Sequence, residues 1–292
     1  MTLAEVRLAL LRRARRPGWI APLFARAALK LAPPAGGDLA VQLWGRRVRL
    51  PASHHLPFIV GSNPLSFMAL VHCAAALSNS SLTVVDVGAN VGDSVALLES
   101  YLPGRCRFVC VEPNAEWMPY LQANTDGLPV ERLRDFIGEG QNLALKPGDP
   151  GTAGSIVSAS GNASVPLDEI CEGRQVDLIK VDTDGFDFPI LRSGVRTLSS
   201  IRPALFFEWD PGLWSAQGEN PEAVFDWLND IGYTDFCFFG DGGHFYCRTK
   251  CKQPETIRSL VAVSTLRRGL DNLYWDVLPL RRRSAIGPLR TM

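Results

Sequence analysis

The sequence is poor in the residues that build common metal and redox sites. Its 292 residues include four histidines and seven cysteines, and no two cysteines form a CxxC pair. Cys247 and Cys251 lie four residues apart without a matching cysteine or histidine pair nearby, which excludes the usual zinc-binding spacings. We interpret the cysteines as reduced thiols, several of them buried, in a cytosolic protein.

The sequence also lacks a net charge and long apolar runs. Thirty basic residues balance thirty acidic ones, so the composition predicts no nucleic-acid partner. No stretch approaches the roughly 20 apolar residues that span a bilayer. The segment Leu3–Leu31 is nevertheless typical of basic amphipathic helices, which either pack on the domain or lie on an anionic membrane surface. Arginines interrupt its apolar stretches, which excludes a signal peptide, and we expect a cytoplasmic protein that can lie against the inner face of the membrane.

Three segments differ in their pattern. Residues 1–80 predict a helical extension with a hairpin over Leu39–Leu50, and residues 251–292 predict a helix with a basic end. In residues 81–250, apolar strands alternate with helices. The predicted strands are Thr83–Val87, Arg107–Val111, Val130–Phe136, Val176–Val181 and Ala204–Phe207, followed by an antiparallel pair over Thr234–Phe239 and Phe245–Arg248.

This alternation predicts an α/β fold with a doubly wound, Rossmann-like and mostly parallel sheet covered by helices on both faces. Helices are expected over Asp93–Tyr101, Ala115–Asn124, Phe188–Leu198 and Glu222–Ile231. Ligands of such sheets bind beyond the carboxyl ends of the strands. The functional residues should therefore follow the predicted strands directly.

A glycine-rich turn follows the first of these strands, where residues 86–93 read DVGANVGD. A dinucleotide fingerprint has glycines where this chain has Gly88, Asn90 and Asp93. Because an aspartate at a helix N-terminus repels a pyrophosphate, the turn does not favour a dinucleotide. S-adenosylmethionine carries an ammonium and a sulfonium but no phosphate, so Asp86 and Asp93 suit it, with close approach at Gly88 and Gly92. The alternative is that Asp93 only caps the helix and that the loop holds no ligand.

The next two strand ends supply further candidates for the cofactor site. Glu112, with Asn114 beside it, lies 24 positions after Gly88, close to where an acidic residue grips a ribose diol. After the third strand, Asp135 can accept a hydrogen bond from an adenine amine, and Phe136 can stack on the ring.

Three carboxylates follow the fourth strand, at Asp182, Asp184 and Asp187, and Glu208 follows the next. Because carboxylates at one sheet edge repel one another, they raise each other's pKa or recruit a cation. Three uses are open: Asp182 holds the cofactor's ammonium, Asp184 or Glu208 acts as general base, or Asp182, Asp184 and Glu208 together bind Mg²⁺. A turn with solvated aspartates is the alternative.

His244 is a further candidate for the catalytic base. It lies in a glycine-rich turn after the last predicted strand–helix unit and ranks below the carboxylates.

Together these motifs resemble the FkbM family of methyltransferases. The resemblance rests on the segments 86–93, 111–114, 151–153, 167–170, 179–185 and 207–208, and it extends over roughly residues 55–250. Many family members have V-E-G or I-E-G where this chain has Thr183-Asp184-Gly185, so the carboxylate is kept but shortened. The resemblance implies a class I methyltransferase fold, S-adenosylmethionine as cofactor and methylation of a hydroxyl on a polyketide, sugar or cell-envelope glycan.

Two other functions compete with O-methyl transfer. The sequence Asp182-Thr183-Asp184-Gly185 also resembles the nucleophile motif of haloacid-dehalogenase-type phosphohydrolases, but that motif normally opens the fold, whereas here a complete glycine-loop unit precedes it. The second alternative is a non-catalytic module that keeps the cofactor fold for binding. The sequence predicts neither the oligomeric state nor the acceptor.

Overall fold

The computed structural model describes residues 37–52, 54–62, 67–146, 155–158, 161–240, 243–250, 253–267 and 274–281. The basic helices expected over Leu3–Leu31 lie outside these residues, as do the motif segment 151–153 and most of the basic C-terminal end.

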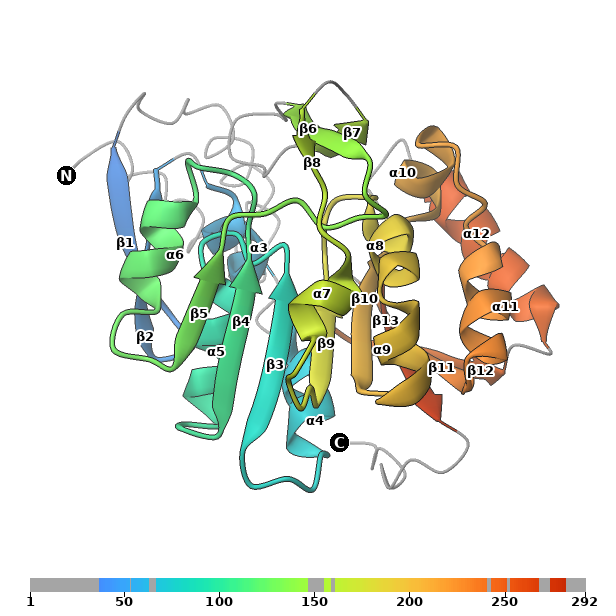
Figure 1. Cartoon of the computed structure of the whole chain (residues 1–292), viewed down its shortest axis with the longest axis horizontal. Coiled ribbons are helices and arrows are strands. Elements are labelled where there is room, and N and C mark those ends of the chain that lie inside the picture. The colour runs from blue at the N-terminus through green and yellow to red at the C-terminus, as the bar shows by residue number, and fades with distance from the viewer. Residues whose placement is uncertain are drawn as a thin grey trace, which may run out of the picture.

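An eight-stranded sheet forms the centre of the described structure, with the order β12-β11-β13-β10-β9-β3-β4-β5 (Figure 1). In this order the strands are β12 (Phe245–Lys250), β11 (Tyr233–Gly240), β13 (Trp275–Arg281), β10 (Ala204–Trp209), β9 (Leu178–Val181), β3 (Leu82–Val87), β4 (Cys106–Val111) and β5 (Val130–Leu133). Neighbours from β10 to β5 are parallel, whereas β11 pairs antiparallel with both β12 and β13, and β13 with β10. The predicted doubly wound, mostly parallel α/β sheet is confirmed.

Side chains of β3 alternate between two apolar cores on opposite faces of the sheet. Val85 and Val87 face one core and Leu82 and Val84 the other, as the period of two in a strand dictates. Figure 1 shows α8 and α9 in front of the sheet and α4 and α5 behind it. The first core contains residues of α7 (Leu167–Cys171), α8 (Asp187–Ser193), α9 (Val195–Ser200), α10 (Pro211–Ala216), α11 (Ala223–Asp230) and α12 (Pro254–Arg267), and the second contains residues of α4 (Met68–Ala75), α5 (Asp93–Tyr101) and α6 (Met118–Asn124).

The C-terminal strand β13 was not predicted. The helix expected in this segment is present as α12, but Trp275–Arg281 continues into the main sheet, where Pro279 pairs with Phe236. A proline argues against a strand inside a sheet, and the partners β10 and β11 are distant in sequence. No local pattern therefore indicated this strand.

Two small sheets flank the central one. The predicted hairpin is confirmed as β1 (Asp38–Leu43) and β2 (Arg46–Pro51), joined at Trp44 and Gly45, whose positive φ values of 49° and 81° suit a tight hairpin turn. The helix α3 (Leu56–Ser62) follows it. The second sheet contains β6 (Asn142–Lys146), β7 (Ser155–Ser158) and β8 (Asn162–Ala163), and it lies beyond the arrowheads of the parallel strands (Figure 1).

Candidate active site

A cavity of about 230 Å³ lies at the carboxyl ends of the parallel strands, beside the point where the strand order reverses between β3 and β9. This is the position at which doubly wound sheets bind their ligands. Part of its wall is apolar and comes from outside the central sheet, namely Leu56, Ile59, Phe67, Leu145 and Ile156. The remaining wall is mainly polar.

Six carboxyl groups line the cavity: Asp93, Glu112, Asp182, Asp184, Glu208 and Asp276. Among the described residues, Lys180 is the one lysine or arginine in the cavity wall. Carboxylates crowded in a site of low polarity favour a cationic ligand and repel a phosphate.

Lys180 lies in the cavity wall and pairs with two neighbouring carboxylates. Its Nζ is 3.1 Å from Asp86 Oδ1 and 3.3 Å from Asp182 Oδ2. Burial acts to lower the pKa of Lys180, but Asp86, Asp182 and Asp93 together hold this pKa well above its usual value. The ammonium therefore stays charged and neutralises part of the cluster. Asp86 is almost fully buried and serves as counter-ion to Lys180 below the cavity wall, whereas Asp182 lines the cavity.

The glycine-rich turn depends on its glycines for close packing. Gly88 has φ +81°, and a Cβ there would lie 1.9 Å from the backbone oxygen of Asp182. Gly92 has φ +84° and packs against α6, where a Cβ on this residue would lie 3.1 Å from side-chain atoms of Leu121 and Thr125. The turn thereby brings Asp93 to the cavity wall, where burial raises the pKa of this carboxyl to about 6. The cap-only alternative for Asp93 leaves this position in the cavity wall unexplained.

Glu112 is fixed by two backbone amides at the end of β4. Its Oε2 accepts the N–H of Asn90 at 2.9 Å, and its Oε1 accepts the N–H of Asn114 at 2.8 Å. Burial raises the pKa of Glu112 to about 7, against the opposing effect of these two hydrogen bonds. Glu112 and Asn90 line the cavity, whereas Asn114 acts on it through Glu112.

The loop after β9 places Thr183 and Asp184 in the cavity wall. Asp184 has a left-handed backbone, with φ 52°, and its pKa is raised to about 7 by burial and by the charges of Asp182 and Asp210. Asp187 closes the loop by accepting the N–H groups of Thr183 and Gly185, each at 3.2 Å. Within the described residues, the buried Thr183 Oγ1 has no hydrogen-bond partner. Because buried polar groups are normally hydrogen-bonded, this hydroxyl is a candidate contact for a ligand in the cavity.

Glu208 and Asp276 face each other across the antiparallel pair of β10 and β13, and both line the cavity. Burial, followed by the charges of Asp182, Asp184, Asp187 and Asp276, raises the pKa of Glu208 well above its usual value. Its buried Oε2 accepts no hydrogen bond from any described residue. Asp276 could not be foreseen because its strand was not predicted.

A sequence family matches this region of the chain. The model of the methyltransferase FkbM domain covers residues 86–234, just over half of the sequence. This chain belongs to the FkbM methyltransferase family. The match spans the glycine turn, Glu112, the loop after β9 and Glu208, and it ends before β13.

Solved methyltransferase structures are distant in sequence. Methyltransferase FkbM from Methylobacillus flagellatus KT is 16% identical, with 77% of this chain and 51% of that chain covered at a TM-score of 0.40. Precorrin-6y C5,15-methyltransferase from Geobacter metallireducens GS-15 is 12% identical, with coverages of 73% and 87% and a TM-score of 0.40. The plantazolicin methyltransferase BpumL in complex with SAH is 10% identical, with coverages of 75% and 83% and a TM-score of 0.38. No curated protein sequence matches the chain.

Three further predicted site residues, besides Asp86, Gly92 and Asn114, do not line the cavity. The third strand ends at Leu133, and the chain then turns to run beside Val165, so that Phe136 is buried in the apolar core and Asp135 lies outside the cavity wall. His244 is exposed in the turn between β11 and β12, two strands away from Glu208. The structure therefore gives none of the three a contact with a ligand in this cavity.

The predicted magnesium site is not supported. In the stretches of chain that the structure describes, no group of three or more histidine, cysteine, aspartate or glutamate side chains is arranged to hold a metal ion. One of the proposed ligands, Asp182, is already paired with the Lys180 ammonium.

None of the described helices combines the length and the apolar character that crossing a bilayer requires.

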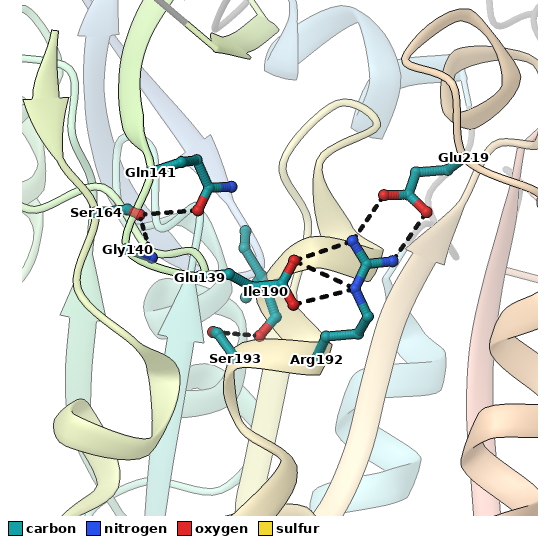
Figure 2. A network of polar contacts seen from close by, with 8 residues as sticks. All are labelled: Glu139, Gly140, Gln141, Ser164, Ile190, Arg192, Ser193 and Glu219. Carbon is teal, nitrogen blue, oxygen red and sulfur yellow. Dashed lines mark hydrogen bonds and ion pairs between the residues drawn. The ribbon is translucent and has the colours of Figure 1, made fainter.

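Arg192, on α8, links the loop before β6 to the loop after α10. Figure 2 shows its guanidinium between the carboxylates of Glu139, in the loop before β6, and Glu219, in the loop after α10. The shortest contacts are 3.1 Å to Glu139 Oε2 and 2.8 Å to Glu219 Oε1. In the same loop, Gly140 donates its N–H to Ser164 Oγ at 3.0 Å, which anchors the small sheet whose Leu145 and Ile156 line the cavity.

Proposed function

We propose that the protein is an S-adenosylmethionine-dependent O-methyltransferase that acts on a hydroxyl of a sugar, glycolipid or cell-envelope glycan. The observation that carries the proposal is the cavity with six carboxyl groups and one lysine at the carboxyl edge of a methyltransferase-family domain. A nucleoside that carries two cationic groups and no phosphate suits such a wall.

The donor set fits this cofactor. Glu112 presents two carboxylate oxygens, held by backbone amides, that can accept hydrogen bonds from a ribose diol. Asp93 and Asp182 supply negative charge for an ammonium, and Asp182 also pairs with the Lys180 ammonium. When bound, S-adenosylmethionine supplies an electrophilic methyl group.

The acceptor hydroxyl must lose its proton as its oxygen becomes a nucleophile, and Glu208 and Asp184 are placed to take it. A carboxyl group with a raised pKa is a better match to a hydroxyl than an ordinary carboxylate, because proton transfer is most efficient when the pKa values lie close. The buried, unpartnered Glu208 Oε2 is the acceptor atom that this role requires. We assign the general-base role to Glu208, with Asp184 as its neighbour in the wall.

The chemical character of the wall also favours a sugar or glycolipid as acceptor. Carboxylates accept hydrogen bonds from the several hydroxyls of a sugar, and the apolar residues Leu56, Ile59 and Phe67 suit a ring face or lipid portion. The same acidic wall disfavours a phosphate ester. We therefore favour a neutral hydroxylated acceptor, used in the cytoplasm, where the cofactor is made.

Transfer of a radiolabelled methyl group from S-adenosylmethionine tests the proposal directly. The full chain is incubated with a panel of neutral glycosides and glycolipids, beside a glucuronide and a sugar phosphate as anionic controls. We expect label in a neutral acceptor and its loss in Glu208→Gln. Tight cofactor binding without transfer to any acceptor would instead indicate a non-catalytic binding module, and Mg²⁺-dependent release of phosphate from an aryl phosphate would indicate a phosphohydrolase.

A further inference from the structure

We propose that His54, which precedes the family-matched domain, is a positioning residue that orients Glu112 toward the cofactor through Asn90. This inference rests on the proposed function, because it concerns how the same cavity holds its nucleoside. It assigns a role in the cofactor site to the N-terminal extension, for which the sequence predicted only helices and a hairpin.

His54 reaches the cofactor turn from the segment between β2 and α3. Its Nε2 lies 3.0 Å from Asn90 Oδ1, and its Nδ1 accepts the N–H of Leu56 at 3.1 Å. Because Nδ1 is an acceptor, the neutral ring carries its hydrogen on Nε2 and donates it to Asn90. Both ring nitrogens are thus engaged within the protein, so His54 is not free to take a proton from an acceptor.

Asn90 connects His54 to Glu112 through two hydrogen bonds, one made by its side chain and one by its main chain. Its backbone has φ 49°, a left-handed conformation that non-glycine residues adopt at a cost unless neighbours hold it. In this conformation its N–H donates to Glu112 Oε2 at 2.9 Å. The side chain of Asn90 is held by His54 while its main chain holds Glu112, and all three residues line the cavity.

The surroundings of His54 favour the neutral ring that this arrangement needs. The edge of its ring meets Trp117, with ring centroids 5.4 Å apart and an interplanar angle of 74°. Burial lowers the pKa of His54, against the effect of the hydrogen bond to Asn90, so the ring stays neutral at pH 7. The contact with Trp117 also defines the competing explanation, in which His54 only fills space beside α6.

Two substitutions separate positioning from packing. His54→Gln keeps a donor for Asn90 but loses the ring, whereas His54→Phe keeps a ring of similar shape but loses both nitrogens. Binding of S-adenosylhomocysteine to the full chain is measured by calorimetry, with thermal melting to confirm folding and the exposed His72→Ala as a matched control. If His54 positions Glu112, His54→Phe weakens binding about tenfold and His54→Gln stays within about threefold of the wild type, as expected for one hydrogen bond to a polar group.

A double-mutant cycle with Asn90→Gly completes the test, because glycine tolerates the positive φ and removes only the side chain. We expect Asn90→Gly to weaken binding about tenfold and His54→Phe to add little in that background. The inference is overturned if His54→Phe binds as the wild type does while His54→Gln is weak, or if Asn90→Gly has no effect, and this last result decides even if His54→Phe does not fold. Failure of the wild type itself to bind would count against the proposed function instead.

Discussion

The family-matched domain and the segments around it contribute different chemistry to one cavity. Residues 86–234 supply five of the six carboxyl groups, which lie near the carboxyl end of a parallel strand or at the start of a helix. The flanking segments supply the histidine that holds Asn90, much of the apolar wall and, on β13, Asp276. The comparison shows that most of the acidic groups of the site come from the domain, whereas the histidine bonded to Asn90 and part of the apolar wall come from the flanking segments.

The largest effect is expected from the ion pair buried in the domain. Asp86→Ala removes a partner of the buried Lys180 and should lower the free energy of unfolding by about 3–5 kcal/mol, because it leaves a buried charge poorly compensated. The flanking hairpin offers the matched control: Asp38→Ala breaks an ion pair with Arg49 whose side chains are half exposed, and should cost about 0–1 kcal/mol. Urea denaturation of both variants measures the difference. Equal losses of free energy of unfolding would contradict the importance of the buried ion pair between Asp86 and Lys180.

Two glycines with the same φ of +81° sharpen the comparison further. Gly88→Ala places a Cβ against the Asp182 backbone, so overpacking adds about 1–3 kcal/mol to the cost of the left-handed conformation. Gly45→Ala, in the hairpin, meets no atom within 4 Å and should cost only about 1–2 kcal/mol. We expect only Gly88→Ala to lose S-adenosylhomocysteine binding in calorimetry. Similar behaviour of the two variants would mean that the domain turn is not packed as described.

Protonation of the domain's carboxyl groups should control binding of a cationic cofactor. The pKa of Glu112 is raised to about 7 and that of Asp93 to about 6, so the empty site is partly protonated at neutral pH. Ionisation of Glu112 alone predicts S-adenosylmethionine binding about tenfold weaker at pH 6 than at pH 8. Calorimetry at both pH values, in two buffers of different ionisation enthalpy, should also detect release of protons on binding. Affinity that is constant with pH would contradict the raised pKa of Glu112.

The same groups give the empty protein a pH-dependent stability of opposite sign. Because the folded pKa of Glu112 lies above its ordinary value of 4.5, the folded protein holds more protons than the unfolded chain between these limits. Its free energy of unfolding should therefore fall as the pH rises from about 4.5 to about 7. Melting temperatures without and with S-adenosylhomocysteine measure this trend, which Glu112→Gln should reduce.

The smallest effect is expected from the ion pairs of Arg192, which link the loop before β6 to the loop after α10. Arg192→Leu removes the ion pairs to Glu139 and Glu219 and should cost about 1 kcal/mol, because the guanidinium is only partly shielded from water and salt. Arg192→Lys should restore little, since one ammonium cannot bridge both carboxylates in the paired geometry of a guanidinium. Unfolding at low and high salt checks this. A salt-independent loss would indicate that packing on Phe188, whose ring centroid lies 4.5 Å from the guanidinium carbon, contributes more than charge.

The sequence predicted the parts of the site that local patterns determine. The helix over Asp93–Tyr101 begins and ends at the predicted residues, because the glycine turn and the apolar spacing specify it locally. The carboxylates Glu112, Asp182, Asp184 and Glu208 line one cavity, as expected for residues that follow parallel strands.

The remaining features depend on contacts that no local pattern encodes. Asp276 reaches the site because β13 inserts between β10 and β11, a pairing of strands distant in sequence. His54 reaches Asn90 because the hairpin packs beside α5 and α6. Phe136, in contrast, was expected to stack on an adenine, but the strand before it is shorter than its apolar residues indicate, and its ring packs in the core.

Calorimetric titration of the full chain with S-adenosylmethionine and, separately, with NAD⁺ tests the central claim most directly. An acidic cavity built for a phosphate-free cation predicts saturable binding of S-adenosylmethionine and no measurable binding of NAD⁺. Binding of NAD⁺ with equal or higher affinity, or no heat from S-adenosylmethionine at concentrations that saturate other methyltransferases, would contradict it.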